Sequence, residues 1–245
     1  MEELTLVATC DGNALAVGAW RVADPKGTVV LFHGIPSATP DAPGAPGYRE
    51  FARTIADAGW NAVWADMRAV RNSPGFFTIE GWVRDVGAVA DVARGLGAAK
   101  LILVGSSAGG AVAAKAIARG VAADGLALLG TPAAWVSFAS SPDLAAMLIT
   151  REAGMALSEE VLADPRAWAA EFADVETERA VVDLEIPILI VHGTADDVVP
   201  VEHADRIAKN ARDVETAIIP GASHRLRHEP EAVDILLEWL ERQAS

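Results

Sequence analysis

Short apolar runs alternate with longer amphipathic stretches over most of this chain. From residue 28 onward the apolar runs are continuous, and the stretches between them carry apolar residues at helical spacing. Continuous apolar runs are typical of parallel strands buried on both faces, so the alternation predicts a parallel sheet covered by helices. The predicted strands are residues 4–9, 13–22, 28–32, 61–65, 101–105, 125–129, 187–191 and 216–219.

Turn and helix signals complete the expected fold. The first two strands are joined by Asp11-Gly12-Asn13, a hairpin signal, so they should form an antiparallel edge. Residues 133–180 read as irregular, with two or three helical stretches. The sequence therefore predicts an α/β fold in one domain, residues 1–245, with a mostly parallel eight-stranded sheet and a short cap-like insertion at about 133–180. Helices are expected near 48–58, 82–96, 108–118, 202–212 and 230–242.

Composition favours a soluble protein of a reducing compartment. About half of the 245 residues are apolar, and no apolar run approaches the roughly 18 to 20 residues that span a bilayer. The stretch Met1–Leu4 is acidic and lacks the features of a signal peptide. The single cysteine, Cys10, excludes an internal disulfide framework and reads as a small apolar filler. We expect a cytoplasmic protein without a membrane partner.

Charge narrows the set of partners. The formal net charge of −14 argues against nucleic acid or an anionic membrane as a ligand. The five histidines are scattered, and none has zinc-site spacing with cysteine, so we expect no structural metal. No phosphate-binding glycine loop is present either, and we expect no cofactor. The sequence leaves the oligomeric state open.

The most informative motif is Gly105-Ser106-Ser107-Ala108-Gly109. It follows the apolar run 101–104 and leads into a helix rich in small residues. Strand, Gly-x-Ser-x-Gly and helix together predict a nucleophile elbow, in which the serine stands on a strained turn between flanking glycines. Ser107 is the predicted nucleophile; Ser106 lacks the symmetric glycines, and an ordinary tight turn is the alternative interpretation.

A serine nucleophile needs a base and an acid that orients the base. The predicted strand 187–191 runs into a loop with Asp196 and Asp197, and the strand 216–219 runs into a loop that ends at His224. Carboxyl ends of parallel strands meet at one edge of a sheet, so these loops should lie near Ser107. The order along the chain is serine, aspartate, histidine.

These loops resemble those of the α/β-hydrolases, and the resemblance covers nearly the whole chain. His192–Pro200 resembles the acid loop of that family, which implies that Asp196 is the catalytic acid, while Asp197 stays open as an alternative. Gly221-Ala222-Ser223-His224 resembles the loop of the catalytic histidine, which implies that His224 is the base.

The resemblance extends to two loops earlier in the chain. His33-Gly34-Ile35-Pro36 resembles the oxyanion loop, which implies that the backbone N–H groups of Ile35 and Ala108 form the oxyanion hole. The stretch 66–75 resembles a structural loop of the family but has Ala69 and Arg71 where glycine is usual. Within it, Asp66 is expected to pair with Arg68.

The other histidines have structural interpretations. His33 and His192 each stand beside a glycine at a strand end, where an imidazole commonly bonds backbone loops. His203 follows the acid loop on a predicted helix and should be solvated. His228 precedes the last helix as a surface or capping residue.

The expected activity is hydrolysis of a small or medium carboxylic ester through a covalent acyl-enzyme. By family position, Pro36 and Val198 should line the substrate cleft together with Ile35, and Trp135 should do so from the cap segment. The apolar residues of that segment either bind substrate or anchor the segment, and both readings stay open: Trp135, Phe138, Met147, Leu148, Met155, Leu157, Trp168 and Phe172. Thioesterase, amidase or aminopeptidase, and carbon–carbon hydrolase activities are alternatives, and so is a non-catalytic binding module on this fold.

Overall fold

A single twisted sheet runs through the centre of the molecule. The structure is a computed structural model that describes residues 1–39, 41 and 43–244. Over these residues the sheet has eight strands in the order β1-β2-β4-β3-β5-β6-β7-β8. The strands are β1 (Glu2–Cys10), β2 (Asn13–Arg21), β3 (Thr28–Phe32), β4 (Asn61–Ala65), β5 (Leu101–Ser106), β6 (Gly125–Leu129), β7 (Ile188–Gly193) and β8 (Val214–Ile219).

Strand directions confirm the predicted mixture. The pairs from β4 through β3, β5, β6 and β7 to β8 are parallel, whereas β1 pairs antiparallel with β2, and β2 pairs antiparallel with β4. Cys10 faces Asn13 across the hairpin, and the two turn residues Asp11 and Gly12 have φ of 50° and 77°. Both residues are thus left-handed, as a two-residue type I′ turn requires.

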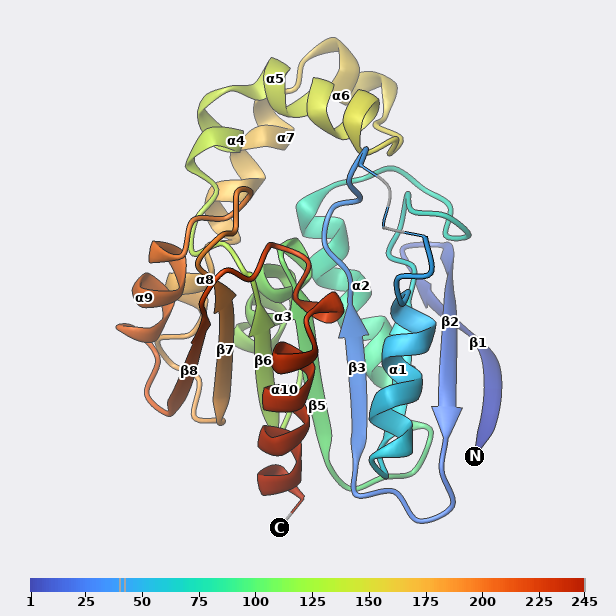
Figure 1. The fold of residues 1–245 in the computed structure, drawn as a ribbon. Coiled ribbons are helices and arrows are strands. Elements are labelled where there is room, and N and C mark those ends of the chain that lie inside the picture. Colours follow the sequence, from blue (N-terminus) through green and yellow to red (C-terminus); the bar gives the residue numbers. More distant parts are fainter. Residues whose placement is uncertain (40, 42, 245) are drawn as a thin grey trace.

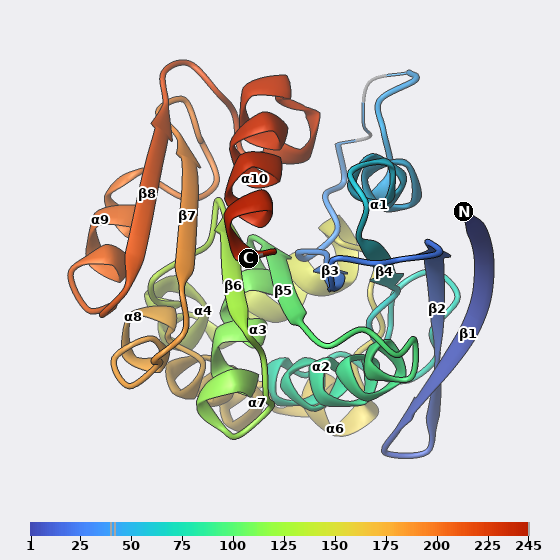
Figure 2. The ribbon, with the colours of Figure 1, turned by 90° about the horizontal axis from the view of Figure 1, so that it is seen from below.

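Helices cover both faces of the sheet (Figures 1 and 2). Helices α1 (Tyr48–Asp57) and α10 (Pro230–Gln243) lie on one face, and α2 (Ile79–Arg94) and α3 (Ala108–Ala118) lie on the other. The strands β3 and β6 are buried along their whole length, which explains why they read as continuous apolar runs. In the described part of the chain, no helix has the length and apolar character to cross a membrane.

The segment after β6 is more helical than the sequence indicated. Its first part folds into a layer of short helices above the carboxyl ends of the strands, and its last helix, α8 (Thr177–Ala180), returns to the side of the sheet near β7 (Figure 1). Each of these helices has only four to six residues, which is too short for apolar periodicity to identify. They are α4 (Val136–Ser140), α5 (Pro142–Met147), a π-helical turn (Leu148–Glu152), α6 (Glu159–Ala163), α7 (Arg166–Ala170), a 3-10 turn (Glu171–Asp174) and α8 (Thr177–Ala180). Helix α9 (Glu202–Ala208) then follows β7 and is shorter than predicted.

Candidate active site

Ser107 stands on a strained turn between β5 and α3. Its φ of 51° and ψ of −124° lie in a region that residues with side chains rarely adopt. The Ser107 N–H donates to the Leu129 carbonyl at 2.8 Å, which fixes the turn against the end of β6. A side chain at Gly105 would overlap the backbone of α3, and one at Gly109 would overlap the end of β3. The glycines are therefore required by the close crossing of strand and helix.

An acid and a base meet beside this turn. His224 follows β8, and its Nδ1–H donates to Oδ2 of Asp196 at 2.7 Å. Asp196 follows β7, and its Oδ1 accepts the backbone N–H groups of Val198 at 3.0 Å and Val199 at 2.8 Å. Burial alone would raise the pKa of Asp196, but hydrogen bonds from His192, His224 and Val199 outweigh it and hold this pKa well below its ordinary value. Asp196 therefore stays ionised, and the alternative acid, Asp197, forms no hydrogen bond or ion pair with His224 in the described structure.

Ser107 and His224 line the same cavity. Gly130, with φ of 56°, passes close to the hydrogen bond between Asp196 and His224. A Cβ atom at this position would lie 3.3 Å from both Asp196 Oδ2 and His224 Nδ1. Within the described residues no direct hydrogen bond joins Ser107 Oγ to the imidazole. Such bonds are often long in ligand-free enzymes and tighten when substrate binds.

The two residues expected to supply oxyanion-hole N–H groups are Ala108, which follows Ser107, and Ile35, which lines the same cavity. The Ala108 N–H belongs to the first turn of α3, where no helical partner exists. The Ile35 N–H donates no hydrogen bond within the described chain, and Ile35 lines the cavity. Gly34 lies against the elbow, because a side chain at Gly34 would be 2.8 Å from Ser107 Cβ. The assignment of the oxyanion hole to the Ile35 and Ala108 N–H groups stays a prediction.

His33 holds the loop that presents Ile35. Its Nδ1–H donates to the Gly34 carbonyl at 2.7 Å, and its Nε2 accepts the Met67 N–H at 3.0 Å. Burial lowers the pKa of His33 to about 4, so the ring is neutral. His192 is also buried, and its Nε2–H donates to the Val199 carbonyl at 2.8 Å, with Asp196 Oδ2 at 3.3 Å. His33 thus bonds loop backbone, as the sequence predicted, whereas His192 bonds loop backbone and also the side-chain carboxylate of Asp196.

The expectation of a solvated His203 was wrong, and of the two roles left open for His228, surface or capping, the structure excludes capping. His203 is half-buried rather than solvated, because its Nδ1 accepts the Ala133 N–H at 2.9 Å. His228 does not cap α10; it lies in a 3-10 turn (Leu226–His228), and its Nε2–H donates to the Pro46 carbonyl at 3.1 Å. In both cases the partner is more than 50 residues away, so local sequence contained no signal for it.

The ion pair expected between Asp66 and Arg68 does not form. Arg68 points into the protein, where its guanidinium bonds the buried carboxylate of Asp85 at 2.6 Å and Asp11 at 2.9 Å. Asp66 pairs instead with Arg71 at 3.0 Å.

The backbone of the loop at residues 66–75 is left-handed at the two positions where the α/β-hydrolases usually have glycine. Ala69 and Arg71, the two departures from glycine, have φ of 63° and 45°. Left-handed backbone at a residue with a side chain costs on the order of 1 kcal/mol. The chain therefore keeps the loop shape in spite of the substitutions.

Cys10 was expected to be a small apolar filler, but it also has a polar contact, with Arg68. Nη2 of Arg68 donates to its Sγ at 3.1 Å. Partial burial and the neighbouring carboxylate of Asp85 raise the pKa of the thiol to about 11. The thiol is therefore protonated and unreactive at neutral pH.

The cavity at this site has a volume of about 1020 Å³. Pro36, Trp135 and Val198, the three residues expected to contact substrate, all line it. Sequence reasoning missed polar lining residues from α9 and from the loop that carries His224. Of these, Ser223 and Arg225 had a local signal, since they stand on either side of His224. The lining residues not predicted from the sequence include Ser37, Thr39, Ile149, Glu152, His203, Arg206, Ser223 and Arg225. Among the described residues, no group of histidine, cysteine and carboxylate side chains is placed to hold a metal ion.

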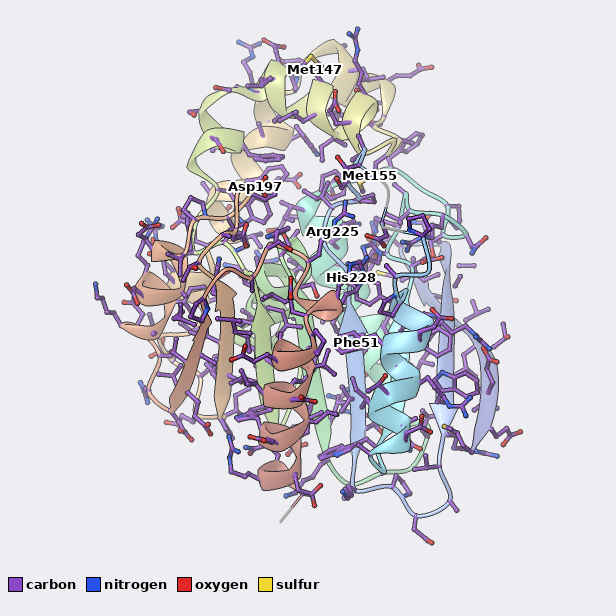
Figure 3. All side chains as sticks on the ribbon, viewed as in Figure 1. Phe51, Met147, Met155, Asp197, Arg225 and His228 are labelled. Carbon is purple, nitrogen blue, oxygen red and sulfur yellow. The ribbon has the colours of Figure 1, made fainter. Side chains whose placement is uncertain are left out.

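Apolar residues of the cap segment divide between the two roles left open by the sequence. Trp135, Phe138 and Leu148 line the cavity. Four others are buried and anchor the segment: Met155, Leu157, Trp168 and Phe172. In Figure 3, Asp197 and Arg225 lie between the sheet and the cap helices, whereas Met147 lies on the outer side of the cap, where it is 39% exposed.

Comparisons with known proteins agree with the fold. A sequence profile of the Alpha/beta hydrolase family matches residues 29–235. Est1E from Butyrivibrio proteoclasticus superimposes with a TM-score of 0.74 at 20% identity, over 97% of this chain and 98% of that chain. A thermophilic esterase from Thermogutta terrifontis gives 0.73 at 20% identity over 100% of both chains. A proline iminopeptidase from Mycobacterium smegmatis gives 0.69 at 18% identity, over 98% of this chain and 99% of that chain. No curated protein matches the chain in sequence.

Proposed function

Because the chain belongs to the alpha/beta hydrolase family, we propose that it is a serine hydrolase that cleaves small or medium carboxylic esters through a covalent acyl-enzyme. One observation carries the proposal: an imidazole bonded to a buried carboxylate shares a cavity with a serine held on a strained turn. The single cysteine supports a reducing, cytoplasmic location as part of the same proposal.

The proposed reaction begins with the tautomer of His224. Asp196 accepts the Nδ1 proton, so Nε2 is left unprotonated as the base. His224 takes the Ser107 proton as Oγ attacks the ester carbonyl, and the N–H groups of Ala108 and Ile35 receive the developing oxyanion. The imidazolium then protonates the leaving alcohol. A water molecule, deprotonated by the same imidazole, attacks the acyl-enzyme and releases the acid.

The cavity supports an ester with an apolar acyl or alcohol group. Its volume is at the upper end of the roughly 300 to 1000 Å³ of ligand pockets, and Trp135 and Phe138 offer aromatic surface. Est1E, a similar fold, has been solved with bound ferulic acid, an aromatic acid. We therefore place aryl or short alkyl esters first among substrates.

An aminopeptidase or amidase is the second candidate. Glu152 and Asp197 line the cavity, and neither forms an ion pair within the described residues. Carboxylates at such positions would favour a substrate ammonium group, and a proline iminopeptidase shares the fold. Parallel assays with aminoacyl p-nitroanilides and p-nitrophenyl esters would decide between the two activities.

Hydrolysis of p-nitrophenyl butyrate tests the proposal. We expect Ser107→Ala and His224→Ala each to lower kcat by about 10⁴-fold or more, with an unchanged fold by circular dichroism. Ser106→Ala is the matched control, and it should retain turnover because Ser106 precedes the elbow serine. Turnover at the wild-type rate by Ser107→Ala would refute the assignment.

A further inference from the structure

His203 lines the cavity but has no part in the proposed reaction. It lies in the first turn of α9, directly after the loop that carries Asp196. One edge of its ring faces the start of the cap segment, where it accepts the Ala133 N–H. The residue therefore joins α9 to the cap and lines the cavity between them.

The contact with Ala133 determines where the imidazole carries its proton. Because Nδ1 accepts an N–H at 2.9 Å, Nδ1 is unprotonated. Burial, together with the nearby charge of Arg206, lowers the pKa of His203. The ring is therefore neutral at pH 7, and its one N–H is at Nε2.

The Nε2 atom is accessible, and His203 lines the cavity. Within the described chain Nε2 has no hydrogen-bond partner, and it is not one of the buried polar atoms that lack a partner. We propose that the Nε2–H of His203 binds an oxygen atom of the substrate and so selects esters whose apolar part contains an ether, hydroxyl or carbonyl oxygen. This inference rests on the proposed function, since it specifies the substrate of the same site.

The surrounding charges favour a neutral oxygen over a carboxylate. Two arginines of the described chain line the cavity, and both are already paired. Arg206, one turn further along α9, bonds Glu178 at 2.9 and 2.6 Å. Arg225 bonds Asp41 at 2.8 Å. Glu152 and Asp197, which also line the cavity, add negative charge to it. A substrate carboxylate would be repelled, whereas an uncharged acceptor would gain the hydrogen bond at no such cost.

The apolar side of the cavity would bind the apolar part of the substrate. Trp135, Phe138 and Leu148 line it from the cap, close to the Ala133 end that His203 holds. A chain or ring that packs on these side chains can present an oxygen to α9. The expected substrate is thus amphipathic and uncharged.

The test compares p-nitrophenyl hexanoate with analogues in which oxygen replaces one methylene at carbon 3, 4 or 5 of the acyl chain. For each enzyme, the ratio of kcat/KM for the analogue to kcat/KM for hexanoate is measured. The intrinsic reactivity of each ester is the same for every enzyme, so differences between variants in this ratio report binding of the oxygen.

Two substitutions at position 203 separate the two contacts of the ring. In His203→Asn the amide oxygen reaches the place of Nδ1 and keeps the bond to Ala133, but the Nε2 donor is lost. In His203→Gln the amide nitrogen reaches the place of Nε2, but the bond to Ala133 is lost. Glu202→Gln, an exposed neighbour on α9, is the matched control.

We expect His203→Asn to lower the ratio for at least one analogue by about three- to tenfold, the effect of one lost neutral hydrogen bond. His203→Gln and Glu202→Gln should keep the ratio within about twofold of wild type. Equal ratios for wild type and His203→Asn with every analogue would overturn the proposal.

Binding measurements distinguish failure of this inference from failure of the proposed function. The dissociation constants of the same esters are measured by calorimetry with Ser107→Ala and with Ser107→Ala/His203→Asn. Weaker binding of an oxygen analogue by the double variant, relative to hexanoate, supports the role of His203 even if no ester is hydrolysed. Equal relative binding by both proteins refutes it.

Discussion

His33 should make the protein lose stability in mild acid. Its side chain is 4% exposed and has both ring nitrogens bonded to backbone. Burial lowers its pKa from 6.5 to about 4. As pH falls through this window, the unfolded chain binds a proton at position 33 while the folded protein does not. The stability from neutral His33 is therefore complete above pH 6.5 and is lost on acidification.

The size of the loss follows from the two pKa values. One pKa unit corresponds to about 1.4 kcal/mol, so the fall in pKa from 6.5 to about 4 gives a maximum loss of about 3 kcal/mol. Between pH 8 and pH 5 the loss is about 2 kcal/mol, because the unfolded state is then nearly fully protonated at this residue.

Urea unfolding at pH 8 and pH 5 measures this loss. The free energy of unfolding of wild type should fall by about 2 kcal/mol more than that of His33→Gln, which has no titrating ring. The other acid-sensitive groups are common to both proteins and cancel in the comparison. An equal fall for the two proteins would refute the conclusion that the fold holds His33 neutral.

Three further predictions concern the buried ion pair, the strained loop and the acid. Asp85→Ala should cost about 3 to 5 kcal/mol of unfolding free energy in urea titrations, since it leaves the Arg68 charge buried without its main partner; a cost below about 1 kcal/mol would contradict this. Ala69→Gly should raise the stability by up to about 1 kcal/mol by relieving the left-handed φ of 63°, and any loss of thermal stability would count against it. Asp196→Asn should lower kcat by about 10⁴-fold, whereas Asp197→Asn should change it by less than about tenfold, and the reverse order would move the acid to Asp197.

The strands and the elbow could be predicted because their signals are local. Buried parallel strands are apolar throughout, as in β3, and the elbow needs glycine at positions 105 and 109 because the backbone crossing leaves no room for a side chain. Both properties are visible in a few consecutive residues. The family profile and the sheet order agree with that part of the prediction.

Contacts between distant segments could not be predicted in the same way. The roles of His203 and His228 depend on backbone groups at Ala133 and Pro46, and no periodicity connects those positions. The same holds for Arg68. The carboxylate nearest to it in the sequence is Asp66, but its main partner, Asp85, is 17 residues away. The sequence indicated only two or three helical stretches in the cap segment, because helices of four to six residues are too short for apolar periodicity to identify.

Labelling with a fluorophosphonate tests most directly whether Ser107 is the activated nucleophile. The reagent phosphonylates serines that an adjacent base has activated, and mass spectrometry of the digested protein locates the adduct. We predict one adduct, on Ser107, which is absent in Ser107→Ala and forms far more slowly in His224→Ala. An unlabelled wild-type protein, or an adduct on another residue, would contradict the account.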